Sequence, residues 1–567
     1  TRGGIPTDCT GVDVAASPEK FTLLDDVART FNGKRVQAGG KCVYVRIDKK
    51  SSGAAEQALA AGWDEGRDGP NPNIWSPAGG AWGSVLDQHL SQRGEKDYAP
   101  AGYKALMLTP LVIAMPRPMA EALGWPQAEI GYADVISLAR DPAGWAAKGH
   151  PEWGPFKLGK TNPNFSTSGL NATIATYYAA TGKVKGLSSD DLGSPTVRDF
   201  VTGVEQSVVH YGDTTLTFLS NLYREDQRGR GLTYISAVTV EEKSILDYNK
   251  GDPEGKLRPD QNGTAPRVPL VAIYPKEGTL FSDNPLFVLD TPWNDDEHKV
   301  AARAFIDWVT SDRDAQSQAL RYGFRPGSPE IALGAPIVAD NGLDPKKPAT
   351  VLEVPRPTTV ARILDLWEQT RKRARVLLLL DVSGSMGDNV TRGQTKLDLA
   401  KEAITEGLSR FTAGDQLGLW VFTTDLTGGA DYLELVPVGD AGSTSEQVRG
   451  RVAGLTPLNG TPLYSATLAA HRGMQGGYDP QRINAIVLLS DGRNEDRRND
   501  DRAGLLQSLG TTTKETQTPV RIFPISYGKD ADLPTLRSIA EATDAAVYDA
   551  SDAGTIVKVF QAVVSNF

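Results

Sequence analysis

The chain has 567 residues, 40% of them hydrophobic and 23% charged, which is ordinary for a globular protein. Its length is enough for about three or four globular units. A formal net charge of -10 argues against a general binder of nucleic acid or anionic membranes. No apolar run approaches the ~18 residues that a membrane-spanning helix needs.

The first 110 residues alternate short strands with helices, which predicts a mostly parallel sheet. The first strand runs into a helix capped at Ser17, and Val43–Ile47 and Ala54–Ala61 are the next strand and helix. Trp75 and Trp82 precede a further helix. These two rings could stack on a sugar, but a place in the core is favoured.

The chain contains two cysteines, Cys9 and Cys42, on either side of the first predicted strand and helix. We expect a disulfide that closes a loop of about 30 residues, worth roughly 3–4 kcal/mol in the chain-entropy model. Such a bond implies an oxidising compartment. Two buried free thiols in a cytosolic protein are the alternative. Because the sequence starts at Thr1 without a signal peptide, we expect a processed or trimmed chain whose signal or anchor lies upstream.

A strand at Leu111–Pro116 leaves the first unit, and Val268–Pro275 is predicted to return to it. A helix at His298–Val309 follows. The expected module therefore covers residues 1–338, with lobe 1 at about 1–110 and 270–338 and lobe 2 at about 111–269.

This layout resembles bacterial extracellular solute-binding proteins of the type 2 periplasmic-binding fold, over roughly residues 8–338. The resemblance implies two lobes that close on a small polar solute by a hinge motion. It rests on the order of five segments, which are Ser51-Ser52-Gly53, the Met115-Pro116 crossover, Asn164–Gly169 at a helix start, Ala301–Val309 and Gly323–Pro326.

Hydroxyl groups at predicted helix starts are the candidate cleft residues, because open α/β sheets bind ligands at the carboxyl ends of their strands. Hydroxyls and backbone N–H groups there suit an oxyanion or another polar solute. The alternative is that these residues are plain helix caps. The candidates are Ser51, Ser52, Ser166, Thr167, Ser168, Asp213 and Thr214, with Thr215 beside them.

Residues 339–374 are expected to form a linker and a connecting helix. The helix spans Thr358–Thr370 and carries an apolar stripe, which should pack it onto one or both neighbouring units. The stripe consists of Val360, Ile363, Leu364 and Trp367.

Residues 381–387 read Asp-Val-Ser-Gly-Ser-Met-Gly and directly follow the apolar run Val376–Leu380. A buried strand thus delivers one carboxylate and two hydroxyls, at alternate positions, into a turn. Thr461 follows later on a loop that enters a helix, and Asp491 comes after a second buried strand at Ile486–Leu489. Oxygen ligands of this kind select hard cations.

These segments resemble the metal-ion-dependent adhesion site of von Willebrand factor A (VWA) domains, where Asp-x-Ser-x-Ser opens the site. The resemblance implies a doubly wound, Rossmann-like domain over residues 375–567 and one divalent cation, Mg²⁺ foremost, with Mn²⁺ or Ca²⁺ as alternatives. Plain helix capping explains one such turn but not three matched segments. The metal set carried over is Asp381, Ser383, Ser385, Thr461 and Asp491.

Three neutral hydroxyls and two largely indirect carboxylates leave an open position on the cation that favours an anionic oxygen. A protein partner's Asp or Glu is the simplest source. We therefore expect a non-enzymatic extracytoplasmic binding protein, secreted or attached to the cell surface, with the solute-binding-like module as sensor or scaffold. The alternative is the receptor of an ABC-type uptake system for an oxyanion, sugar or peptide, with an accessory VWA domain.

No sequence signal points to catalysis, because the five His are scattered and neither a nucleophile elbow nor a phosphate-binding loop occurs. Two charged segments remain. Arg371–Arg375 is interpreted as a solvated helix end. Arg493–Arg502 is interpreted as a solvated loop or, alternatively, as a frame for the partner surface beside Asp491.

Overall fold

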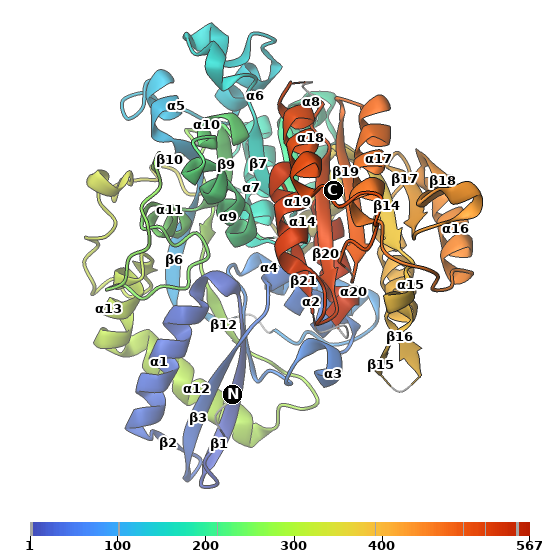
Figure 1. The fold of residues 1–567 in the computed structure, drawn as a ribbon. Coiled ribbons are helices and arrows are strands. Elements are labelled where there is room, and N and C mark those ends of the chain that lie inside the picture. The colour runs from blue at the N-terminus through green and yellow to red at the C-terminus, as the bar shows by residue number, and fades with distance from the viewer. Residues whose placement is uncertain are drawn as a thin grey trace. The chain divides into compact units, whose positions relative to one another are not determined.

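The computed structural model describes residues 4–99, 102–212, 214–391, 393–491, 493–515, 518–551 and 555–567. The chain divides into two compact units, residues 1–371 and 372–567. Figure 1 labels their helices and strands. Both units are mixed α/β structures, as the sequence predicts.

Lobe 1 of the first unit is built on a sheet with strand order β2-β3-β1-β4-β12-β5. β1 pairs in parallel with β3 and β4, and β12 returns from the second lobe to pair antiparallel with β4. Phe31 and Phe305 meet edge to face in the core. The elements are β1 (Cys9–Ala16), α1 (Phe21–Lys34), β2 (Gln37–Ala38), β3 (Lys41–Lys49), α2 (Ser52–Ala61), α3 (Glu65–Asp68), β4 (Ile74–Ser76), α4 (Ala81–Gln92), β5 (Lys104–Ala105), β12 (Pro285–Val288), α12 (Asp296–Ser311) and α13 (Arg313–Arg321).

Lobe 2 is built on a second sheet with strand order β10-β6-β9-β7-β8. The long strand β6 also pairs with the short strands β11 and β13 near its start, so it carries the chain from one lobe into the other. The elements are β6 (Met107–Pro116), α5 (Arg117–Ala122), α6 (Tyr132–Arg140), β7 (Leu158–Thr161), α7 (Thr167–Thr181), the 3₁₀ turn η4 (Ser189–Gly193), α8 (Pro195–Gln206), β8 (Val208–Gly212), α9 (Thr215–Gln227), α10 (Gly231–Tyr234), β9 (Ala237–Glu241), α11 (Glu242–Asn249), β10 (Leu270–Ile273), β11 (Phe281–Ser282) and β13 (Arg325–Pro326).

Helix α14 (Pro357–Thr370) closes the first unit and packs on both of its lobes. It lies against α4 of lobe 1 and against α7, α8 and η4 of lobe 2. Trp367 donates its indole N–H to the Glu205 carboxylate of α8 at 3.1 Å. Leu366 is buried, whereas Leu364, predicted in the apolar stripe, is only partly buried.

The predicted disulfide between Cys9 and Cys42 is confirmed. The two residues lie directly opposite each other on the parallel strands β1 and β3, with their Cα atoms 4.4 Å apart. Trp75 and Trp82 are both 1% exposed, as expected of core residues.

The second unit has one six-stranded sheet with the order β18-β17-β14-β19-β20-β21. All its pairings are parallel except that of the edge strand β18 with β17. Val376–Leu380 is at most 1% exposed on both faces, because helices cover both sides of a parallel sheet. The elements are β14 (Arg373–Asp381), β15 (Asn389–Thr391), β16 (Gln394–Thr395), α15 (Lys396–Gly407), β17 (Gln416–Phe422), β18 (Tyr432–Asp440), α16 (Ala441–Ala453), α17 (Leu463–Gly476), β19 (Arg482–Ser490), α18 (Arg502–Glu515), β20 (Arg521–Tyr527), α19 (Leu533–Ala542), β21 (Tyr548–Ala550) and α20 (Ile556–Val564).

One sequence interpretation is wrong in this region. Arg371–Arg375 is not a solvated helix end, because Arg371 is only 4% exposed and β14 begins at Arg373. Of the four basic residues there, Arg373 and Arg375 lie in β14, the strand that leads to the candidate metal centre.

Candidate metal centre and interlobe cleft

The carboxyl edge of the second unit's sheet brings Asp381 and Asp491 together. β14 and β19 are parallel neighbours, with Leu380 opposite Leu489, so Asp381 ends one strand beside the end of the other. Ser490 donates its hydroxyl to Asp381 Oδ2 at 2.5 Å. Asp381 is 0% exposed and Asp491 is 2% exposed. Two carboxyl groups are therefore held out of water at one point.

The turn after β14 adds the two serines to this point. The Ser383 backbone N–H donates to Asp381 Oδ1 at 2.8 Å. The hydroxyls of Ser383 and Ser385 lie 3.1 Å apart, and Ser385 donates to Asp491 Oδ1 at 2.8 Å. A chain of hydrogen bonds thus runs from one carboxylate to the other through the turn.

Thr461 comes from a third loop, which is fastened on both sides. The Gly384 N–H donates to the Asn459 carbonyl at 2.7 Å, and the Glu495 N–H donates to the Thr461 carbonyl at 2.8 Å. Thr461 is 1% exposed. The three sequence segments that resembled an adhesion site therefore form one hydrogen-bonded cluster. Through Glu495, the charged loop 493–502 is part of it.

Burial, together with the charge of Asp491, raises the pKa of Asp381 to about 7, although hydrogen bonds from Ser490 and Ser383 lower it. A buried carboxyl of this kind requires a nearby positive charge to stay ionised at neutral pH. The oxygen-only donor set and the pair of carboxyls fit a hard divalent cation. Such a cation, held by Asp381, Ser383, Ser385, Thr461 and Asp491, would supply that charge.

The sequence reading missed Lys396, the first residue of α15. Its ammonium lies 2.5 Å from Asp491 Oδ2 and 3.3 Å from Asp388 Oδ2. Burial lowers its pKa, but the hydrogen bond to Asp491 and the charges of Asp491 and Asp388 raise it, and the net direction is upward. A lysine at a helix start has no distinctive sequence pattern, so only the fold reveals this contact.

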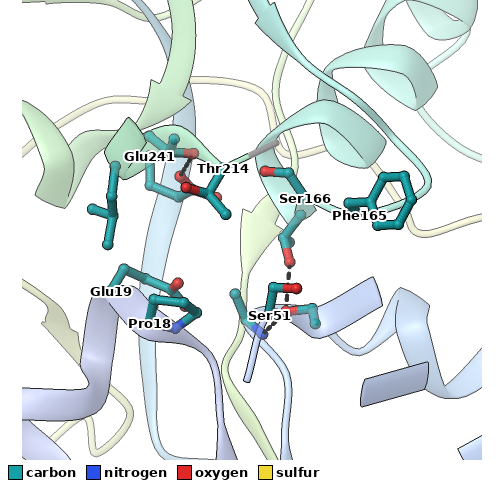
Figure 2. A pocket seen from close by; sticks show the side chains of 12 residues that line it. Pro18, Glu19, Ser51, Phe165, Ser166, Thr214 and Glu241 are labelled. Carbon is teal, nitrogen blue, oxygen red and sulfur yellow. Dashed lines mark hydrogen bonds between the residues drawn. The ribbon is translucent and has the colours of Figure 1, made fainter. Parts of the chain in front are cut away.

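The cleft between the two lobes is lined by most of the predicted residues (Figure 2). Ser51 and Ser52 approach from lobe 1, and Ser166, Thr167, Thr214 and Thr215 approach from lobe 2. Ser168 does not line the cleft, and Asp213 lies outside the described residues.

The two lobes touch directly across this cleft. The Gly53 N–H donates to the Phe165 carbonyl at 3.1 Å, and Thr167 donates its hydroxyl to Ser52 Oγ at 3.2 Å. Trp82 donates its indole N–H to Thr167 Oγ1 at 2.8 Å. The space left between the lobes is about 30 Å³, which holds little more than ordered water. A larger solute could enter only when the lobes separate.

Behind the cleft wall, Ser168 joins a cluster of hydroxyls within lobe 2. Its Oγ lies 2.8 Å from Thr161 Oγ1, 3.1 Å from Ser166 Oγ and 2.7 Å from Thr215 Oγ1. Ser168 is 1% exposed. Its role is therefore to hold the starts of α7 and α9 together.

Two carboxyl residues that line the cleft, Glu19 and Glu241, were also missed. Figure 2 places Glu19 on the side of Pro18 and Ser51, facing Glu241 and Thr214. Burial, and next the charge of Glu19, raise the pKa of Glu241 to about 7. Glu19 stands in the helix start at Ser17-Pro18-Glu19, where the sequence pattern indicates only a helix cap.

A larger cavity of about 680 Å³ lies in lobe 2, away from every predicted site residue. It is lined by Trp125, by Tyr274 directly after β10, and by several residues between Ala339 and Thr350. The Arg117 guanidinium lies 5.4 Å from the centre of the Trp125 ring. Acidic and basic side chains both line it, so its charge indicates no ligand class.

The fold and these two sites define a two-lobed solute-binding protein that carries a VWA domain. The family model for bacterial extracellular solute-binding protein matches residues 12–325, and the model for von Willebrand factor type A domain matches residues 376–494. The chain therefore belongs to the bacterial extracellular solute-binding protein family. Membership in this family implies an extracytoplasmic location.

Solved structures similar to the chain include members of both groups. The periplasmic binding protein AfuA from Actinobacillus pleuropneumoniae, with exogenous fructose-6-phosphate bound, is 14% identical with a TM-score of 0.42, over 64% of this chain and 99% of that one. The sulfate-binding protein SubI from Mycobacterium tuberculosis H37Rv is 17% identical with a TM-score of 0.37, over 63% and 97%.

A von Willebrand factor type A structure from Catenulispora acidiphila is 21% identical with a TM-score of 0.29, over 34% of this chain. The match spans 42% of that structure's own length. No curated protein matches the chain. Among the described residues, no helix combines the length and apolar character needed to cross a bilayer.

Proposed function

We propose that the VWA domain binds a divalent cation, Mg²⁺ first, and through it an acidic group of a protein partner. The solute-binding module acts beside it as sensor or scaffold. The protein is thus a binding protein rather than an enzyme.

The observation that carries this proposal is the hydrogen-bonded series from Asp381 through Ser383 and Ser385 to Asp491. The side chains of these four residues are two carboxylates and two hydroxyls, and oxygen ligands select hard cations. Ser385 is the least buried of the four, so the cluster reaches the surface on its side. A cation bound there has an open position toward solvent, and a carboxylate suits it best.

Calorimetric titration of the full chain with Mg²⁺ tests the proposal. We expect one binding event in the native protein and none in Asp381→Ala. Glu402→Gln, an exposed carboxyl on α15, serves as the matched control and should bind as the native protein does. Equal affinity of the native protein and Asp381→Ala would refute the proposal.

A second candidate function is that of a solute receptor for an uptake system. The cleft lining supports it, because the N-caps of α2, α7 and α9, which are Ser51, Ser166 and Thr214, all line one cavity. Backbone N–H groups at helix starts attract anions. The carboxyl groups of Glu19 and Glu241 argue against an anion as the ligand, and the described lining residues include no basic side chain.

A thermal-shift panel separates these ligand classes. Oxyanions, sugars, short peptides and small amines are each added to the full chain, and a ligand at 100 times its dissociation constant should stabilise the first unit by about 2.7 kcal/mol. A responding ligand should lose its effect in Thr214→Val. No response to any class would count against a receptor role.

A further inference from the structure

Asp381 and Asp491 lie at the carboxyl edge of the VWA domain's sheet, which is called the VWA edge below. Lys396 already supplies one positive charge there. It is 7% exposed, and its ammonium contacts Asp491 Oδ2 at 2.5 Å. The other oxygen of the same carboxylate accepts the Ser385 hydroxyl at 2.8 Å. Both Asp491 oxygens are therefore occupied by groups of the chain itself.

The local backbone fixes Lys396 at this place. Thr395 caps α15 in a reciprocal capping box with Asp398, which sets the start of the helix. The Lys396 backbone N–H donates to the Asp388 carbonyl at 3.0 Å. The side chain thus spans from Asp388, which is 64% exposed, inward to Asp491, which is buried.

These contacts give the ammonium two carboxylates, one buried and one at the surface. Without a divalent ion, the inner position partly neutralises the pair Asp381 and Asp491. With a divalent ion beside Asp491, like charges would stand close together in a poorly hydrated place, where their repulsion is strong. The outer carboxylate, at 3.3 Å, is the alternative partner of Lys396.

We infer that Lys396 is a resident counter-ion of the VWA edge, which competes with the divalent cation for Asp491 and shifts toward Asp388 when the cation binds. This inference rests on the proposed function. Its further consequence concerns the partner. With Asp381, Asp491 and Asp388 ionised, the site carries three negative charges, which Lys396 and a divalent ion together balance. A site without net negative charge does not repel an anionic partner group, whereas loss of the Lys396 charge would leave one carboxylate unbalanced.

Two variants with opposite expected effects test the inference. In Lys396→Met the competitor is removed, so the Mg²⁺ dissociation constant from calorimetry should fall by about 10- to 100-fold, the range typical of changes next to a metal centre. In Asp388→Asn the ammonium loses its outer partner, so the same constant should rise several-fold. Lys396→Arg keeps the charge and should bind close to the native protein. Circular dichroism and thermal unfolding check that each variant folds, and Lys396→Gln replaces Lys396→Met if that variant does not.

A second readout addresses the partner group. Mn²⁺-loaded protein is titrated with acetate, and displacement of metal-bound water is followed by water-proton relaxation. Acetate should bind less tightly to Lys396→Met than to the native protein.

The outcomes separate the inference from the proposed function. If the native protein binds Mg²⁺ and Lys396→Met binds it no more tightly, Lys396 merely orients Asp491 and the inference is wrong. If binding appears only in Lys396→Met, the inference is supported. If neither protein binds Mg²⁺ or Mn²⁺, both the inference and the proposed function fall.

Discussion

The interlobe cleft and the VWA edge begin from the same kind of sequence, in which Ser and Thr stand where strands end and helices start. At the VWA edge the hydroxyls of Ser383 and Ser385 lead to the carboxylate of Asp491. In the cleft Thr167 donates to Ser52, so hydroxyls from the two lobes satisfy each other. The hydroxyls at the VWA edge thus lie beside charged groups, whereas those in the cleft hold two lobes together.

The difference lies in the carboxyl and cationic groups around the hydroxyls. Asp491 has the ammonium of Lys396 against it at 2.5 Å. Glu241 faces Glu19 and has no basic side chain beside it among the described lining residues. Hydroxyl-rich helix starts therefore predict a polar site but not its charge.

The largest effect is expected from breaking the charged cluster that ties α14 to lobe 2. Glu205 is 0% exposed, forms an ion pair with the equally buried Lys160, and accepts hydrogen bonds from Tyr211 and Trp367. Glu205→Ala leaves a buried ammonium without its partner, so the unfolding free energy of the first unit should fall by about 3–5 kcal/mol.

Urea denaturation of the full chain measures this change. Asp199→Ala on the same helix removes an exposed pair with Arg140 and should cost at most about 1 kcal/mol. Mg²⁺ binding by the second unit should stay unchanged in Glu205→Ala. Equal losses of unfolding free energy in Glu205→Ala and Asp199→Ala would contradict a stabilising role for the buried cluster.

The second-largest effect is a pH dependence of the unfolding free energy that arises from the cleft alone. The folded-state pKa of Glu241 is about 7, above the ordinary value of 4.5. A raised folded pKa gives stability that is fully present below pH 4.5 and is lost as the pH rises through 7. At about 1.4 kcal/mol per unit, Glu241 should therefore account for a loss of about 3 kcal/mol across this window.

Unfolding free energies of the native protein and of Glu241→Gln, measured from pH 4 to 8, test this. The difference between the two curves should grow with pH in favour of the variant. Parallel curves would show that Glu241 titrates normally.

The third prediction, with a smaller effect, concerns a substitution that should push the two lobes apart. A Cβ atom at Gly53 would lie 2.3 Å from the Asn164 carbonyl oxygen and 2.6 Å from Phe165 Cα, both backbone atoms of the opposite lobe. Gly53→Ala should therefore destabilise the closed lobes by about 1–3 kcal/mol and increase the radius of gyration in small-angle scattering. Gly33→Ala in α1, where a Cβ meets nothing within 4 Å, is the control. An unchanged radius in both would indicate lobes that are already apart in solution.

The smallest effect compares one serine from each site. Ser52→Ala leaves the Ala78 N–H and the Thr167 hydroxyl without their acceptor, at a cost of about 1–2 kcal/mol in unfolding free energy. Ser385 is only half-buried, so Ser385→Ala should change stability by less than about 0.5 kcal/mol, while weakening Mg²⁺ binding. Thermal unfolding and calorimetry on both variants distinguish the roles. A reversed pattern would contradict the distinction drawn between the two sites.

The sequence predicted the fold well because its signals are local. The apolar run Val376–Leu380 and the alternation of strands and helices define parallel sheets in both units. The segments of the predicted metal set, from Asp381 to Asp491, come together because each stands at a strand end, in the turn after it or on a neighbouring loop. Lys396 and Glu241 were not predicted, because their importance comes from contacts with residues distant in sequence. Lys396 and its partner Asp491, for example, are 95 positions apart. The packing of α14 on two lobes is equally non-local.

Helix α14 also has a mechanical consequence. The polypeptide passes from its last residue, Thr370, to β14 within three residues, and β14 ends at Asp381. A pull applied at the candidate metal centre and carried along the chain therefore reaches α14 before any other helix of the first unit. Because α14 is held by α4 on one lobe and by α7 and α8 on the other, the load falls on both lobes at once.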